Sequence, residues 1–265
     1  MFFTKKTKFS KKKIDIIGLG AGDGKREAVL MQCLIDAYPD LSIHCHLIDT
    51  SYPLLLVAHS NLCSIFSKSA RVTFQEHHGD FHRLPQMSDI FDSETSEHTL
   101  RVGTMFGATL GNLDNELRFI RDSLQAFKPG DLFLVDVMLG FASPQNEEHI
   151  MKEDPRFAPN TNTWRSGLEH WLESTLFQYR NHCPNIEFEN VLSRTTSPIP
   201  NTYTVEIHAM IETESSKKAR FNMVRLHRYE QESFIGSFAK EGWKRIGGKT
   251  FGYEKKRLWY LFMKE

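Results

Sequence analysis

The chain has 265 residues, 40% of them hydrophobic, with 33 basic and 33 acidic residues. This length is enough for one sizeable core carrying an appended region. A formal net charge of zero argues against nucleic acid or a membrane as a partner held by bulk charge. The apolar runs are too short to span a bilayer, and no apolar segment follows the lysines of residues 1–13. We therefore expect a cytoplasmic protein with a solvated basic tail over 1–13, or a tail that contacts an acidic partner.

Apolar runs alternate with helical segments between residues 14 and 140. Buried strands are predicted at 14–19, 41–48, 71–75, 100–106 and 132–138. Helices are predicted at 25–37, 52–66 and 115–127, with a polar loop at 88–98. The first helix is expected to bury Ala28, Val29, Cys33, Leu34 and Ala37, and Asp114 is expected to cap the third helix. This alternation is typical of a doubly wound, mostly parallel sheet, so an α/β Rossmann-like domain is expected over 14–142.

The pattern changes after residue 142. A helix is predicted at 163–180, and turn-rich segments separate apparent antiparallel strands at 187–193, 203–212 and 219–229. A helix at 231–241 and a hairpin formed by 244–251 and 257–263 follow. We expect 143–230 to be an inserted α+β region that binds substrate, and 231–265 to complete the main sheet.

A glycine-rich loop follows the first strand and opens the first helix. It reads Gly18-Leu19-Gly20-Ala21-Gly22-Asp23-Gly24. Glycines let the backbone turn sharply and approach a ligand closely. The spacing lacks the third glycine of the dinucleotide fingerprint, which favours a cofactor without a phosphate. A purely structural turn is the alternative.

Two acids follow the next strands. Asp49, with Thr50, ends the second strand, where an acid can accept both hydroxyls of a ribose. The alternative for Asp49 is a cap for the helix that starts near Tyr52. Asp80-Phe81 follows the third strand and can contact an adenine, although a surface acid beside a core Phe fits equally well.

The fourth strand ends in Phe106-Gly107-Ala108-Thr109-Leu110-Gly111-Asn112-Leu113. The two glycines allow close approach, and the amide of Asn112 can accept from an amine and donate to a carboxylate. A turn at the start of a helix is the alternative.

Together, the glycine loop, Asp49, Gly79-Asp80-Phe81 and above all the 106–113 block resemble the histidine-specific S-adenosylmethionine (SAM)-dependent methyltransferases over about residues 14–140. This family includes the histidine Nα-methyltransferase of the ergothioneine pathway and the fungal dimethylallyltryptophan N-methyltransferases. The resemblance implies a class I methyltransferase fold, SAM as cofactor, and methyl transfer to an amine nitrogen of an amino acid or of a small molecule derived from one. It implies that SAM is held by Gly18, Gly20, Gly22, Lys25, Arg26, Asp49, Thr50, Asp80, Phe81, Gly107 and Thr109. Asn112 would then orient the α-amino group of the substrate.

Arg225, His227 and Tyr229 alternate along a predicted strand and form either part of a substrate pocket or a solvated sheet face. His227 and Tyr229 are candidate catalytic residues, and His227 or Glu206 is a candidate proton acceptor. The histidines near Asp80 lack paired ligand spacing, so no metal site is expected.

Two other functional classes stay open. One is a methyltransferase for a protein or peptide acceptor, which the short segment before the first strand favours. The other is a non-catalytic partner subunit with a SAM-binding fold, against which the intact Gly20, Gly22, Asp49 and Asp80 argue. The oligomeric state is not predicted.

Overall fold

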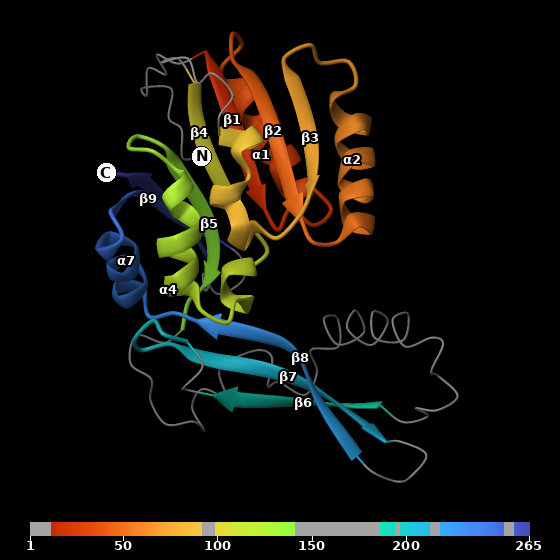
Figure 1. The fold of residues 1–265 in the computed structure, drawn as a ribbon, viewed down its shortest axis with the longest axis vertical. Coiled ribbons are helices and arrows are strands. Elements are labelled where there is room, and N and C mark those ends of the chain that lie inside the picture. The colour runs from red at the N-terminus through yellow and green to blue at the C-terminus, as the bar shows by residue number, and fades with distance from the viewer. Residues whose placement is uncertain (1–11, 92–98, 141–185, 194–196, 213–217, 252–256) are drawn as a thin grey trace.

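A seven-stranded sheet flanked by helices forms the upper part of the molecule as drawn in Figure 1. The computed structural model describes residues 12–91, 99–140, 186–193, 197–212, 218–251 and 257–265. The strand order is β3-β2-β1-β4-β5-β10-β9. These strands are β1 (Lys13–Leu19), β2 (Ser42–Asp49), β3 (Val72–His78), β4 (Thr99–Met105), β5 (Leu132–Met138), β9 (Trp243–Phe251) and β10 (Arg257–Lys264). Strands β1 to β5 pair in parallel, whereas β10 pairs antiparallel with both β5 and β9. The expected α/β fold with a mostly parallel sheet is confirmed.

Helices cover both faces of this sheet and close two separate cores. Along β1, Ile14 and Ile16 belong to one core, whereas Ile17 and Leu19 belong to the other. The first core includes residues of α1 (Lys25–Ala37) and α2 (Tyr52–Phe66). The second includes residues of the helical segment 116–126 and of α7 (Gln231–Lys240). The central strands are therefore apolar on both sides, as expected of a doubly wound parallel sheet.

Two sequence predictions about helices are wrong in detail. Helix α1 buries Glu27, Ala28, Met31, Leu34 and Ile35, while Val29 is 60% exposed and Cys33 is also exposed. The predicted helix at 115–127 is not regular. It consists of α4 (Glu116–Arg118), a π-helical turn (Phe119–Ser123) and a 3-10 turn (Leu124–Ala126). Its cap is Asn115, whose side chain accepts from the amide of Arg118, and not Asp114.

Short helices follow two strands on the side where ligands bind in such sheets. The 3-10 helix η1 (Phe81–Gln86) follows β3, and the 3-10 helix η2 (Thr109–Asn112) follows β4. A further short helix, α3 (Ser88–Phe91), begins the segment predicted as a loop. In the described part of the chain, no helix combines the length and apolar character needed to cross a membrane.

A second sheet lies beyond the carboxyl ends of the parallel strands (Figure 1). It consists of β6 (Ile186–Ser193), β7 (Tyr203–Glu212) and β8 (Lys218–Arg228), paired antiparallel. The predicted helix at 163–180 lies outside the described residues, as do residues 1–11 of the basic tail.

The chain leaves the main sheet after β5 and returns to the same place after β8. The amide of Gly140 donates to the carbonyl of Tyr229 at 2.8 Å, and the amide of Tyr229 donates to the carbonyl of Met138 at 3.1 Å. The end of β5 and the end of β8 are thereby held side by side.

Candidate functional site

The glycine loop turns directly over the end of β2. Gly20 and Gly22 have φ values of +67° and +57°, a left-handed conformation that favours glycine. The amides of Gly20 and Ala21 both donate to the carbonyl of Ile48, at 2.9 and 3.2 Å. Apart from the adjoining residues, no atom of the described residues lies within 4 Å of the point where Gly22 would carry a Cβ, so this part of the loop borders open space.

Asp49 ties this loop to the end of β2. Its Oδ2 accepts from the amide of Gly22 at 2.9 Å, and its Oδ1 accepts from the amide of Ser51 at 2.8 Å. The residue is 8% exposed. Ser51, not Asp49, is the N-cap of α2, and no side-chain bond caps that helix. Asp49 is therefore fixed by the loop, and each carboxylate oxygen has a further lone pair for a ligand. Thr50 beside it is exposed.

Asp80 and Phe81 begin η1 on the neighbouring strand end. Both the amide and Nδ1 of His82 bond to Oδ1 of Asp80, at 2.9 and 2.8 Å. Oδ2 of Asp80 has no partner among the described residues, and the side chain is 48% exposed. The Phe81 ring lies 3.4 Å from the position of a Cβ on Gly20. The structure thus brings Asp80-Phe81 next to the glycine loop.

The segment after β4 completes this group in an unusual backbone conformation. Gly107 has φ +83°, and Ala108 also adopts the left-handed region at φ +59°. A non-glycine residue there is strained, and the strain is held by Asp136. Its Oδ1 accepts from the amide of Ala108 at 2.6 Å. The Thr109 hydroxyl donates to the carbonyl of Phe106 at 2.5 Å, and its Cγ2 lies 3.0 Å from the Cβ position of Gly20.

Arg26 lies between α1 and this segment. Its Nη1 is 2.8 Å from the position of a Cβ on Gly107 and 3.8 Å from Oδ2 of Asp136. The φ of Gly107, +83°, is the feature that favours glycine at this position. Asp136 is 1% exposed and also binds Arg257 at 2.8 Å. Lys25 instead points to Asp23, at 2.8 Å, and is largely exposed. Of the two basic residues, Arg26 is therefore the one that lies against the segment after β4 and pairs with Asp136 on β5.

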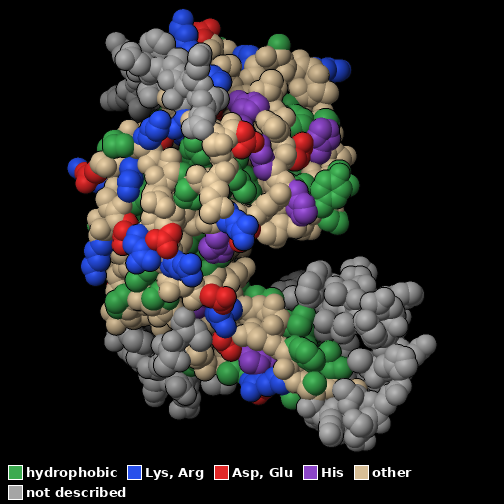
Figure 2. All heavy atoms as spheres, in the orientation of Figure 1, with side chains coloured by type: hydrophobic (Ala, Val, Ile, Leu, Met, Phe, Trp, Pro, Cys, Tyr) green, Lys and Arg blue, Asp and Glu red, His purple; other side chains and the backbone are tan. Residues whose placement is uncertain are grey.

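These segments line a pocket of about 410 Å³ at the carboxyl ends of β1 and β4. Its walls come from the glycine loop, the first turn of α1 and the segment after β4, and consist of Gly20, Ala21, Gly22, Asp23, Lys25, Arg26, Glu27, Phe106, Gly107 and Thr109. Figure 2 shows a notch between the main body and the second sheet, which lies beyond the carboxyl ends of the parallel strands (Figure 1).

Glu27 is a pocket residue that the sequence analysis missed. Desolvation raises the pKa of its carboxyl to about 7, although the hydroxyl of Thr104 donates to it at 3.3 Å. The available signal was an acid next to Ala28, Met31 and Leu34 on the inward face of an amphipathic helix. Only the packing shows which face that is.

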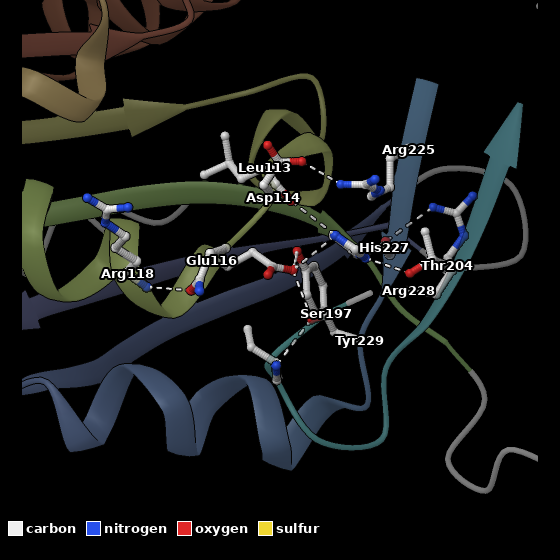
Figure 3. Close-up of polar contacts among 12 residues, drawn as sticks. Leu113, Asp114, Glu116, Arg118, Ser197, Thr204, Arg225, His227, Arg228 and Tyr229 are labelled. Carbon is white, nitrogen blue, oxygen red and sulfur yellow. Dashed lines mark hydrogen bonds and ion pairs between the residues drawn. The ribbon is translucent and has the colours of Figure 1, made fainter. Parts of the chain in front are cut away.

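The three residues expected near the acceptor are placed differently from one another. Asn112, at the end of η2, is exposed. His227 and Tyr229 are 1% and 0% exposed and lie in a polar cluster between η2, α4 and β8 (Figure 3). The solvated sheet face considered for this strand is therefore ruled out at these two positions.

Both ring nitrogens of His227 have partners. Nδ1 lies 2.7 Å from the Thr204 hydroxyl, and Nε2 lies 3.2 Å from the carbonyl of Leu113. A carbonyl only accepts, so Nε2 carries the hydrogen and Nδ1 accepts from Thr204. Burial lowers the pKa of His227 to about 4. The expected role of His227 as a proton acceptor is corrected: neither nitrogen is available to a substrate.

Tyr229 donates its hydroxyl to Oε1 of Glu116 at 2.9 Å, and the Ser197 hydroxyl donates to the same oxygen at 3.0 Å. Glu116 is fully buried. Arg225, the third residue of the trio, forms ion pairs with Asp114 and Glu206. The cluster therefore joins the second sheet to the segment that carries Asn112.

We expect the free energy of unfolding to depend on pH through His227. The pKa of the unfolded residue is about 6.5 and that of the folded residue about 4, so the unfolded state binds the proton first as pH falls. Stability from this residue is present above pH 6.5 and is lost toward pH 4. Between pH 7 and 5 the loss is about 2 kcal/mol. Urea unfolding of wild type and His227→Gln at both pH values measures it.

The variant is needed because other groups titrate in the same range. Burial also lowers the pKa of His46, to about 3, which adds to the acid loss. Glu27 acts in the opposite direction, because its pKa is raised in the folded state. Its contribution to the free energy of unfolding is lost as pH rises through 7. If the free energy of unfolding of His227→Gln falls between pH 7 and pH 5 by as much as that of the wild type, the expectation is wrong.

Within the described ranges, no group of three or more histidine, cysteine, aspartate or glutamate side chains is arranged to hold a metal ion.

Comparisons with known proteins give structural likenesses of low identity. No family model and no curated protein matches the sequence. A SAM-dependent methyltransferase from Clostridium acetobutylicum aligns with a TM-score of 0.43 and 12% identity, covering 94% of this chain and 83% of that one. The glycopeptide N-methyltransferase MtfA, complexed with SAM, gives 0.45 and 11%, with coverage of 95% and 87%. The 1,6-didemethyltoxoflavin-N1-methyltransferase of Burkholderia thailandensis gives 0.45 and 8%, with coverage of 94% and 70%. At these scores, the assignment of function rests on the geometry of the pocket itself.

Proposed function

We propose that this chain is a SAM-dependent methyltransferase that acts on an amine nitrogen of a small molecule. The observation that carries the proposal is the pocket at the carboxyl ends of β1 and β4, with Asp49 buried beside it and bonded to the loop amide of Gly22. In open α/β sheets, ligands bind in this position. When bound, SAM supplies an electrophilic methyl group on its sulfonium.

The residues around the pocket fit an adenosine that lacks a phosphate. The amides of Gly20, Ala21 and Gly22, which would hold a pyrophosphate, already donate to Ile48 and Asp49. Glu27 would also repel a phosphate. We propose that Asp49 accepts the ribose hydroxyls, with Thr50 beside it, and that Asp80 and Phe81 contact the adenine.

The methionine portion would lie along the rest of the pocket. Gly18, Gly20 and Gly22 supply the turn, and Gly107 and Thr109 the opposite wall. Of Lys25 and Arg26, we propose that Arg26 makes the polar contact, since its guanidinium pairs with Asp136 and lies beside Gly107 in the pocket.

The acceptor is proposed to enter through the notch between the main body and the second sheet (Figure 2). Asn112 is exposed at the end of η2, and we propose that its amide orients the amine. Methyl transfer needs an in-line arrangement of donor and acceptor, which is mainly an effect of proximity and orientation. On the strength of the 106–113 block, an amino acid or a molecule derived from one is the proposed substrate class.

The amine must be neutral when it attacks, and the chain offers no strong base for this step among the described residues near Asn112. His227 is enclosed. Burial acts to raise the pKa of Glu206, but hydrogen bonds from His208 and Arg225 outweigh it and hold that pKa below its usual value. We therefore propose that the amine loses its proton to water before transfer, which predicts a rate that rises with pH.

The test has two stages. Calorimetry with S-adenosylhomocysteine should show binding, and its absence at millimolar ligand would overturn the proposal. Incubation with SAM and a panel of amines, including histidine, other amino acids and short peptides, is then read by mass spectrometry. A mass gain of one methyl on an amino acid is expected. Methylation of peptides alone would replace the small-molecule substrate class, and binding without any transfer would favour a non-catalytic subunit.

A further inference from the structure

We propose that the buried carboxylate of Glu27 binds the α-ammonium group of the amino-acid end of the cofactor, while Arg26, oriented by Asp136, binds its α-carboxylate. This inference rests on the proposed function and names the part of the pocket that recognises an amino acid rather than a nucleoside alone.

The side chain of Glu27 packs beside Gly18, which has no side chain of its own to exclude it. It lies in the first turn of α1, and its side chain folds back against the end of β1. A Cβ on Gly18 would lie 3.3 Å from both Cγ and Oε1 of Glu27. The Glu27 side chain thus packs closely against Gly18, where a larger residue would be in tight contact with it. It is 2% exposed and lines the pocket.

The Glu27 carboxylate has no cationic partner within ion-pair distance in the described part of the chain. The charged groups that act on it are Arg26, which favours its ionised form, and Asp23, which opposes it. The backbone amide of Glu27 itself and the hydroxyl of Thr104 on β4 each donate a hydrogen bond to it, and the Cys45 thiol on β2 is buried and neutral. Arg26 is instead directed toward Asp136. An unpaired buried carboxylate is costly, so the site favours a ligand that brings a positive charge.

Arg26 supplies the complementary half of the subsite. Its side chain is 46% exposed and lines the same pocket, while the Asp136 carboxylate behind it is 1% exposed. Asp136 also holds the Ala108 amide and Arg257, so it fixes both the guanidinium and the backbone of the facing wall. An acid and a guanidinium in one pocket match the two charges of an α-amino acid. Asp136 is therefore a positioning residue.

The test compares three ligands by calorimetry. S-adenosylhomocysteine carries both charged groups, its decarboxylated analogue S-adenosyl-3-thiopropylamine keeps only the ammonium, and 5′-methylthioadenosine has neither. Glu27→Gln should weaken the first two at least tenfold and leave the third unchanged. Arg26→Gln and Asp136→Asn should weaken only S-adenosylhomocysteine. Asp15→Asn is the matched control, because it changes a buried acid near the other end of β1.

The pH dependence gives a second, independent readout. If Glu27 must be ionised to bind the ammonium, the affinity of the wild type for S-adenosylhomocysteine should fall about tenfold per pH unit below pH 7. The affinity of Glu27→Gln for S-adenosylhomocysteine should not change over the same pH range. Equal affinities of wild type and Glu27→Gln for all three ligands would overturn the inference. Failure of the wild type to bind even 5′-methylthioadenosine would instead overturn the proposed function.

Discussion

Asp49→Ala is expected to weaken binding of S-adenosylhomocysteine and of 5′-methylthioadenosine alike, by at least a hundredfold. Both ligands carry the ribose, and a carboxylate that accepts two hydroxyls forms two charge-assisted hydrogen bonds of about 1.5–3 kcal/mol each. The substitution also frees the amides of Gly22 and Ser51, which loosens the glycine loop. Calorimetry with both ligands measures the effect.

A merely structural role of Asp49 would give a different result. Thermal unfolding of Asp49→Ala separates loss of fold from loss of binding, and Asp15→Asn again serves as the control for removing a buried acid from a neighbouring strand. If a folded Asp49→Ala protein binds 5′-methylthioadenosine as tightly as the wild type, Asp49 does not bind the ribose.

Glu116→Ala is expected to lower the free energy of unfolding by about 3 kcal/mol. The substitution leaves a cavity and removes the acceptor of the buried Tyr229 and Ser197 hydroxyls. Glu116→Gln should cost less than Glu116→Ala, because the amide fills the same space and keeps the accepting oxygen, while its NH2 group replaces Oε2, which has no hydrogen-bond partner among the described residues. It also removes a carboxyl whose pKa is raised by desolvation. Urea unfolding of the two variants at pH 7 measures both effects.

The control for this pair is Glu232→Ala, which removes an exposed glutamate at the start of α7 and should leave stability within about 0.5 kcal/mol of the wild type. Similar losses for Glu116→Ala and Glu116→Gln would mean that the charge, and not the accepting oxygen, stabilises the cluster. Tyr229→Phe should then be neutral, whereas the structure predicts a cost.

Local patterns predicted the main sheet and its first two helices well. The bounds expected for α1 and α2, 25–37 and 52–66, are those found, because Pro39 lies just beyond the first and Pro53 lies in the first turn of the second. The glycine loop and Asp49 were recognisable because each lies at a strand end. Such positions in a parallel sheet share one edge, and the structure brings them together there.

Features that depend on distant partners were not predictable in this way. Helical periodicity could not show that the segment after Asn115 changes pitch. Alternation along β8 placed His227 and Tyr229 on one face but could not reveal that Leu113 and Glu116 cover it. Glu27 was missed for the same reason, since its burial depends on contacts with Gly18 on β1 and Thr104 on β4.

The paired hydrogen bonds between Gly140, Tyr229 and Met138 hold the two ends of the inserted region together at a fixed junction with the main sheet. Because its two ends are held together by the main domain, the entropy of closing the intervening chain changes only slowly with its length. We therefore expect changes in the length of this region to leave the main sheet intact. Under the proposed function, the inserted region can therefore vary with the acceptor, while the residues proposed to bind the nucleoside lie outside it on the main sheet.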